Sequence, residues 1–110
     1  MGRVESKDQK SGMIHEMTIR AEAQIEMIEA FIWYETKGEG LGDEFLRAVE
    51  ATLAALKRNP MGYPSAFKKI RRALLRRFPY GIFYFVENFQ IVVIACFHSS
   101  RDPRQWQGRA

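Results

Sequence analysis

Apolar side chains recur at helical spacing over residues 21–37, which predicts the first helix of the chain. The stripe expected to face the core follows the spacing i, i+4, i+7 and i+11, and three bulkier residues widen it. It consists of Ala21, Ile25, Ile28 and Ile32, with Met27, Phe31 and Tyr34 beside them. Glu22, Glu26 and Glu29 fall on the other side and predict a solvated face, and Gly38 marks the expected end.

A second helix is expected over residues 43–58, antiparallel to the first and joined to it by a short glycine-rich connector. Asp43 is a good N-cap, and Lys57 and Arg58 stand in the last turn with Pro60 just beyond. Phe45, Val49, Leu53 and Leu56 form its predicted buried stripe. The alanines should allow a close approach to the first helix; they are Ala48, Ala51, Ala54 and Ala55.

Three strand-like runs follow, over residues 67–77, 80–87 and 90–98. Asn88 and Phe89 separate the last two runs at hairpin spacing, although Asn-Phe is a weaker turn signal than Asn-Gly. A short first strand is expected within residues 13–19, and residues 99–110 should fold over the sheet. Two helices followed by a run of strands predict the α+β class, with the helices on one face of a largely antiparallel sheet.

The length of 110 residues suits one domain, which we expect over residues 13–110. Residues 1–12 are polar and without period, so we expect a flexible tail there. The longest apolar run, residues 91–97, is far shorter than a membrane span, and the N-terminus lacks the apolar core of a signal peptide. The expected compartment is therefore the cytoplasm. Cys96 is the only cysteine, so no intramolecular disulfide or thiolate metal cluster is expected.

The net charge of +4 is distributed unevenly along the chain. Residues 1–56 hold 6 Lys and Arg against 11 Asp and Glu, a net charge of −5. Residues 57–110 hold 11 Lys and Arg against 2 Asp and Glu, a net charge of +9. This split indicates either a basic face that attracts an acidic partner or polyanion, or two halves that attract each other.

The stretch 71–84 combines four arginines with a dense apolar run, and Pro79 and Gly81 mark its bend. An unpaired buried charge is costly, so part of this stretch must present positive charge to solvent or to a partner. If the strand is regular, Arg76 and Arg77 point to opposite faces, and one of the two is expected in a structural ion pair.

An ordered set of short motifs resembles the RelE/ParE superfamily of toxins from bacterial type II toxin–antitoxin modules. No single motif is specific, but their order and separations are. They are Ile32-Trp33-Tyr34-Glu35, Gly40-Leu41-Gly42, Phe45-Leu46, Asn59-Pro60, Arg71-Arg72, Arg76-Arg77-Phe78-Pro79-Tyr80, Ile82, Tyr84, Phe97-His98, Arg101-Asp102-Pro103 and Trp106. The likeness covers residues 13–109 and is to the ParE-like branch, often called plasmid stabilization proteins.

The resemblance implies a β-α-α-β-β-β core with an antiparallel sheet covered on one face by a helical hairpin. It also implies a toxin that an acidic antitoxin neutralises by wrapping around it, and it allows a hetero-oligomer of the two proteins. RelE-like members cut mRNA on the ribosome, whereas ParE-like members block DNA gyrase.

RNA cleavage would require a base for the 2′-hydroxyl, an acid for the leaving oxygen and cations around the phosphate. The candidates for these roles are His98, Arg76, Arg77 and Tyr84. Each also has a structural interpretation, since a histidine at a strand end often only makes a hydrogen bond. His98 is the sole group of the C-terminal half that titrates near neutral pH, and no tyrosine follows Tyr84.

The scarcity of acid and base groups favours a toxin that acts by binding, with DNA gyrase as the expected target. The alternatives are a ribosome-dependent mRNA endoribonuclease and a degenerate member without toxicity. No cofactor and no metal are expected. The residues expected to bind the target or the antitoxin are arginines and two phenylalanines: Arg71, Arg72, Arg76, Arg77, Phe83, Phe85, Arg101 and Arg104.

Overall fold

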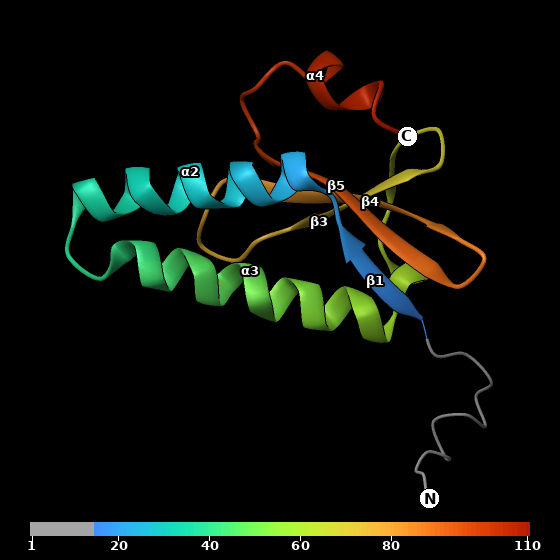
Figure 1. The fold of residues 1–110 in the computed structure, drawn as a ribbon, viewed down its shortest axis with the longest axis horizontal. Helices are drawn as coiled ribbons and strands as arrows, with labels where there is room; N and C mark the ends of the chain where they lie inside the picture. The colour runs from blue at the N-terminus through green and yellow to red at the C-terminus, as the bar shows by residue number, and fades with distance from the viewer. Residues whose placement is uncertain (1–14) are drawn as a thin grey trace, which may run out of the picture.

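A computed structural model describes residues 15–110 of the chain (Figure 1). The elements follow in the order β1 (Glu16–Ile19), α2 (Ala21–Lys37), α3 (Leu41–Arg58), the 3₁₀ turn η1 (Pro60–Gly62), β2 (Ser65–Phe67), β3 (Ile70–Leu74), β4 (Tyr80–Glu87), β5 (Gln90–His98) and α4 (Arg104–Gln107). The expected tail over residues 1–12 and the first two residues of the expected strand 13–19 lie outside the described residues.

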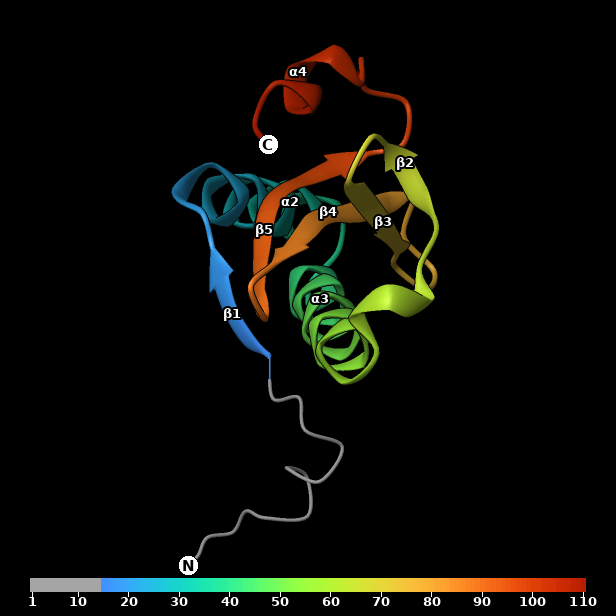
Figure 2. The same cartoon turned by 90° about the vertical axis from the view of Figure 1, so that its right-hand side faces the viewer.

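The sheet has five strands in the order β1-β5-β4-β3-β2, which confirms the α+β class. β2, β3, β4 and β5 pair antiparallel in chain order, whereas β1 pairs parallel with the edge of β5. The helical hairpin α2–α3 provides the long crossover connection that a parallel pair requires. Figure 2 shows this hairpin on one face of the sheet and α4 on the other.

The expected strand 67–77 is two strands and an irregular turn. Ser65–Phe67 and Ile70–Leu74 form a tight hairpin, with Lys68 at a positive φ of 53°. Residues 75–79 then leave the ladder, and Leu75 and Phe78 turn into the core. The prediction failed because the chain reverses at Lys68 and Lys69, and lysine is not one of the residue types that signal a tight turn.

The helical hairpin is closed by glycines and one carboxylate rather than by the expected Asp43 cap. α3 begins at Leu41, two residues earlier than predicted, after Gly40 in the left-handed conformation at φ 85°. The Glu35 carboxylate accepts the N–H groups of Gly40 and Gly42 at 3.0 and 2.9 Å, and these bonds lower the pKa of Glu35. A Cβ on Gly42 would lie 2.7 Å from the carbonyl oxygen of Phe31, so the close approach requires glycine.

Two hydrophobic clusters cover the two faces of the sheet. The larger cluster lies between the sheet and α2–α3, and includes Phe45, Leu56, Tyr84 and the buried Cys96. The smaller cluster lies on the opposite face, where Trp106 of α4 stacks on Phe83 with ring centroids 4.1 Å apart. Residues 99–110 therefore fold over the sheet, as the sequence predicts. No helix formed by the described residues is long and apolar enough to cross a membrane.

Most of the apolar stripe that was expected to bury α2 faces solvent, although Met27 of that stripe is buried and Tyr34 packs on Phe45. Ile25, Ile28 and Ile32 are 54%, 56% and 55% exposed. The helix packs through Ala23, Met27 and Ala30, because small side chains let it lie close to β5. The glutamates are not all solvated either: Glu26 is mostly buried and forms an ion pair with Arg109 at 2.9 Å.

The packing of α3 predicts different costs for two leucines of one helix. Leu56 is fully buried, whereas Leu53 only borders the larger cluster. Leu56→Ala should lower the free energy of unfolding by about 2–5 kcal/mol, and Leu53→Ala by clearly less. Urea denaturation of the two variants measures this difference. Equal losses would place Leu53 in the core and contradict the observed orientation of α3.

The β4–β5 turn predicts a stabilising substitution. Asn88 and Phe89 both have positive φ, 52° and 60°, and the ring of Phe89 is exposed. Phe89→Gly should raise the free energy of unfolding by about 0.5–1 kcal/mol, because only glycine adopts this conformation without strain. Phe89→Ala is the control, since it removes the ring and keeps the strain. Equal gains in the two variants would mean that the backbone conformation is not the cause.

Candidate functional site

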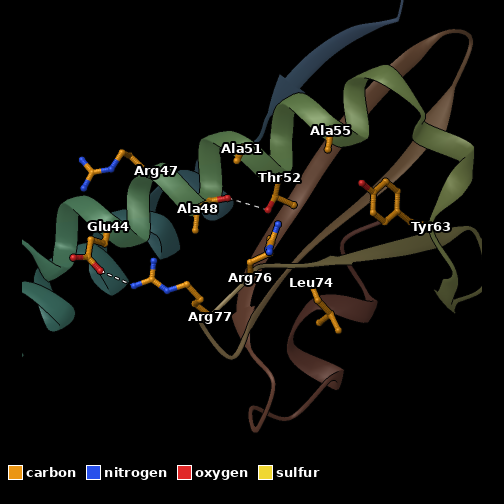
Figure 3. Close-up of a pocket in the computed structure, with 10 residues that line it drawn as sticks. All are labelled: Glu44, Arg47, Ala48, Ala51, Thr52, Ala55, Tyr63, Leu74, Arg76 and Arg77. Atoms are coloured by element: carbon orange, nitrogen blue, oxygen red, sulfur yellow. Dashed lines mark hydrogen bonds and ion pairs between the residues drawn. The ribbon is translucent and has the colours of Figure 1, made fainter.

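A groove of about 770 Å³ runs between α3 and the chain segments around β3 (Figure 3). Its long wall is one face of α3, where small side chains leave the space open. The opposite wall comes from the loop before β2 and from the end of β3 with the turn that follows it. The lining residues are Glu44, Arg47, Ala48, Ala51, Thr52, Ala55, Tyr63, Leu74, Arg76 and Arg77.

The groove changes character along its length, as Figure 3 shows. The Glu44 end carries the charged side chains Arg47 and Arg77, with Arg76 next along the wall. The other end, beside Ala55, is bordered by the Tyr63 ring. Leu74 projects from the end of β3 and is 58% exposed, although it is a large apolar residue. One end of the site is therefore cationic and the other is apolar.

Arg76 and Arg77 line the same groove, so the prediction that they point to opposite faces is wrong. Neither residue lies in a strand, because the turn 75–79 has left the ladder and Arg77 has a positive φ of 71°. Arg77 forms an ion pair with Glu44 at 2.9 Å, and both side chains are substantially exposed. Within residues 15–110, no carboxylate lies within ion-pair distance of Arg47 or Arg76.

Two predicted site residues, Arg71 and Tyr84, hold the loop that carries Tyr63, which lines the groove opposite α3. The Arg71 guanidinium donates a hydrogen bond to the carbonyl oxygen of Tyr63. The Tyr84 hydroxyl donates to the carbonyl oxygen of Pro60, and burial raises the pKa of Tyr84 to about 12. Both side chains hold the loop 60–63 against the sheet. Tyr84 is thus a buried structural group, and it is not exposed to a substrate.

The remaining candidates for partner binding lie on the other face of the sheet, beneath or beside α4. Phe83 and Phe85 are only 5% and 4% exposed, because the C-terminal segment covers them. Arg72 and Arg101 line a small cavity of about 130 Å³ next to Trp106. Arg104 is bound by Asp102 at 2.7 Å. The predicted binding set is therefore divided between two faces of the molecule.

His98 lies in a separate cleft of about 370 Å³ between α2 and the end of β5. Its Nδ1 accepts the backbone N–H of Ser100 at 3.0 Å, which leaves the proton of the neutral ring on Nε2. Glu29, Tyr80 and Arg101 line the same cleft. The four nuclease candidates are thus not brought together: His98, the pair Arg76 and Arg77, and Tyr84 occupy three different places.

The sequence analysis missed the α3 side of the groove. Glu44, Ala48, Ala51 and Ala55 follow the helical spacing i, i+4, i+7 and i+11, with Arg47 beside them. That spacing was available in the sequence, but the alanines were interpreted as a contact with the first helix. Among residues 15–110, no cluster of three or more His, Cys, Asp or Glu side chains is placed to hold a metal ion.

Comparison with known proteins identifies the fold and the family to which this geometry is similar. The family model described as "ParE toxin of type II toxin-antitoxin system, parDE" matches residues 16–103. A solved structure entitled "Chromosomal ParDE TA system from P. aeruginosa" matches with a TM-score of 0.65 and 14% identity. The match covers 77% of this chain and 96% of that one. No curated protein sequence matches the chain.

The hydrogen bond beneath the groove predicts a loss of stability in Tyr84→Phe. The Pro60 carbonyl oxygen would stay buried without its donor, which should cost about 1–3 kcal/mol of unfolding free energy. Tyr80→Phe is the control, because the Tyr80 hydroxyl makes no hydrogen bond to another side chain or carbonyl within residues 15–110. Thermal or urea unfolding compares the two variants. Equal losses would show that the Tyr84 hydroxyl does not secure the loop.

Proposed function

The chain belongs to the ParE toxin family of type II toxin–antitoxin systems, and on that premise we propose that it inhibits growth by binding DNA gyrase. In this proposal the toxin acts in the cytoplasm and makes contacts, without carrying out chemistry on its target. A cognate antitoxin neutralises it. The groove beside α3 is the contact surface, with Arg76 and Arg77 as its principal side chains.

The proposal rests on one observation: the arginines of the groove and His98 line two different cavities. The groove holds three arginines, the Glu44 carboxylate and the Tyr63 hydroxyl, and its remaining lining residues are small or apolar. Exposed guanidinium groups form strong, directional bonds to carboxylates and phosphates, which suits recognition. No histidine lines the groove, because His98 lies in the other cleft.

A ribosome-dependent endoribonuclease remains the second candidate, and one observation favours it. The His98 cleft also contains Glu29, Tyr80 and Arg101, so a base, an acid and a cation line one cavity. In such a mechanism a carboxylate would take the 2′-hydroxyl proton, and Arg101 would stabilise the phosphate charge. His98 would protonate the leaving oxygen from its doubly protonated form, in which Nδ1 no longer accepts the Ser100 N–H. A degenerate member of the family would show neither activity.

Two assays separate these functions: supercoiling by purified gyrase and cleavage of mRNA on translating ribosomes. The parent protein should inhibit supercoiling and leave mRNA intact. Arg76→Ala combined with Arg77→Ala should weaken inhibition by about tenfold or more, since two charge-assisted contacts are lost. Both side chains are exposed, so unfolding midpoints should change little. His98→Ala should inhibit gyrase like the parent. Lys57→Ala combined with Arg58→Ala, exposed at the end of α3 and outside the groove, removes two positive charges and serves as the charge-matched control.

The opposite pattern would overturn the proposal. If the parent cleaves mRNA and leaves gyrase unaffected, and His98→Ala lowers cleavage by about 10²–10⁴-fold, the chain is a nuclease that uses the other cleft. Inhibition of gyrase that is unchanged in the double arginine variant would keep the target but remove the groove as the contact surface.

A further inference from the structure

We infer that the small cavity between α4 and the sheet binds an apolar acid, by which we mean a carboxylate attached to one apolar group. The carboxylate lies between the guanidinium groups of Arg72 and Arg101. The apolar group lies on the aromatic floor formed by Phe83, Phe97 and Trp106. A small organic acid has this chemistry, and so does the C-terminal residue of a polypeptide. The site is on the sheet face opposite the helical hairpin and does not depend on the proposed target (Figure 2).

Gly81 of β4 leaves the cavity open. Side chains alternate between the two faces of a strand, so Gly81 points to the same face as Phe83 and Phe85. The C-terminal segment covers the two rings, whereas no side chain rises from the glycine. The cavity measures about 130 Å³. An engineered apolar cavity of about 150 Å³ in another protein binds benzene, so one ring or one branched aliphatic group fits here.

The same glycine positions Arg72. Arg72 of β3 pairs with Phe83 in the sheet register, and its side chain crosses the neighbouring Gly81. A Cβ on Gly81 would lie 3.1 Å from Cγ and 3.2 Å from Cδ of Arg72, which is closer than ordinary van der Waals contact. The bare backbone of β4 therefore supports the aliphatic part of this arginine, and a larger residue would displace it.

Arg101 reaches the cavity from the next strand. Its guanidinium carbon lies 5.0 Å from the centroid of the Phe97 ring, and Phe97 is the cross-strand partner of Gly81. Directly opposed residues of two antiparallel strands lie about 5 Å apart, so both arginines lie over one small area of the sheet. Arg101 donates one long hydrogen bond to Gln105, at 3.4 Å, which leaves most of its five N–H groups available.

The charges around the cavity favour an anion. Among the described residues 15–110, no carboxylate lies within ion-pair distance of Arg72 or Arg101. Asp102, which follows Arg101 in the chain, pairs with Arg104 at 2.7 Å instead. Two like charges at one cavity repel each other. A carboxylate that accepts hydrogen bonds from both guanidinium groups would remove this repulsion.

The floor of the cavity favours an anion with an apolar group over a bare one. Apart from the two arginines, only His98 and Ser99 contribute polar side chains, and the rest of the lining is aromatic, aliphatic or glycine. A phosphate would lose its hydration shell against such walls. Leu74 stands at the rim and is 58% exposed, so an apolar group in the cavity would also remove Leu74 from water.

The test is a titration of the full-length chain, followed by methyl and indole NMR signals. The probes are 4-methylpentanoate and 4-methylpentanamide, which has the same apolar group without the charge. A short peptide ending in leucine, with a free or an amidated C-terminus, distinguishes a chain end from a small acid. The signals of Leu74 and Trp106 report on the cavity, and those of Ile28 on α2 report on an exposed surface elsewhere.

The acids should shift the Leu74 and Trp106 signals, and the amides should bind at least about tenfold more weakly because the charge-assisted hydrogen bonds are lost. Arg72→Ala and Arg101→Ala should each weaken binding of the acids by about five- to tenfold. Both side chains are exposed, so unfolding midpoints should change little. Arg58→Ala removes the same charge at the exposed end of α3 and should bind like the parent.

A pair of glycine variants tests the positioning of Arg72. Gly81→Ala adds a methyl group that displaces Arg72 and narrows the cavity, so it should weaken binding by about fivefold or more although both arginines are still present. Gly108→Ala is the matched control, because an added Cβ there meets no atom within 4 Å. This variant should bind the acids like the parent.

Three results would overturn the inference. The acid could leave the Leu74 and Trp106 signals unmoved at about 20 mM, the affinity expected of so small a ligand at low efficiency. Acid and amide could bind equally, which would make the cavity purely apolar. Inorganic phosphate could bind as tightly as the acid, which would make it a site for a bare anion.

The tighter of the two acids, peptide or free, identifies the source of the ligand, and either order supports the inference. These measurements use neither gyrase nor ribosomes. Their failure therefore leaves the proposed function standing, and a failure of the supercoiling assay leaves them valid.

Discussion

The close contact between α2 and α3 at Gly42 is the constraint on which the rest of this structure depends. The Gly42 backbone lies against Phe31, and the Glu35 carboxylate satisfies the first N–H groups of α3 in place of a side-chain cap. This closure sets the direction in which α3 leaves α2. Because α2 takes most of the contact with β5, α3 packs against β3 and β4. The space left between α3 and the turn 75–79 is the groove.

The sheet explains why Tyr84 is buried while Arg76 and Arg77 are exposed. β4 and β5 are apolar on both faces, and a bulge leaves Ile94 without a partner on β4, so that Ile94 and Ala95 both join the outer cluster. Both faces must then be covered, one by the helical hairpin and the other by α4. The Tyr84 hydroxyl is used inside this packing, whereas Arg76 and Arg77 are exposed in the turn that leaves the sheet. The groove leaves Leu74, Arg76 and Arg77 open to a partner.

The sequence predicts the fold well because its clearest hydrophobic patterns coincide with helices and strands of the structure. Tyr80–Glu87, Gln90–His98 and the helix Ala21–Lys37 have the predicted bounds. It predicts the site less well. Period counting alone favours Ile25, Ile28 and Ile32 over Ala23 and Ala30, yet the two alanines face the core. A one-dimensional pattern cannot show that residues 75–79 leave the sheet, and that departure is what brings Arg76 and Arg77 together. Glu35 accepts the N–H groups of Gly40 and Gly42, and the spacing of these residues matches no capping motif that could be recognised in the sequence.

The most direct test of the central claim is methyl NMR of the chain in complex with purified gyrase, a method suited to large assemblies. Ala51 and Leu74 report on the groove, whereas Ile25, Ile28 and Ile32 report on the exposed stripe of α2. The account predicts that the Ala51 and Leu74 methyl signals shift or broaden on binding while the three isoleucine signals stay in place. Changes confined to the isoleucines, with Ala51 and Leu74 unaffected, would contradict it.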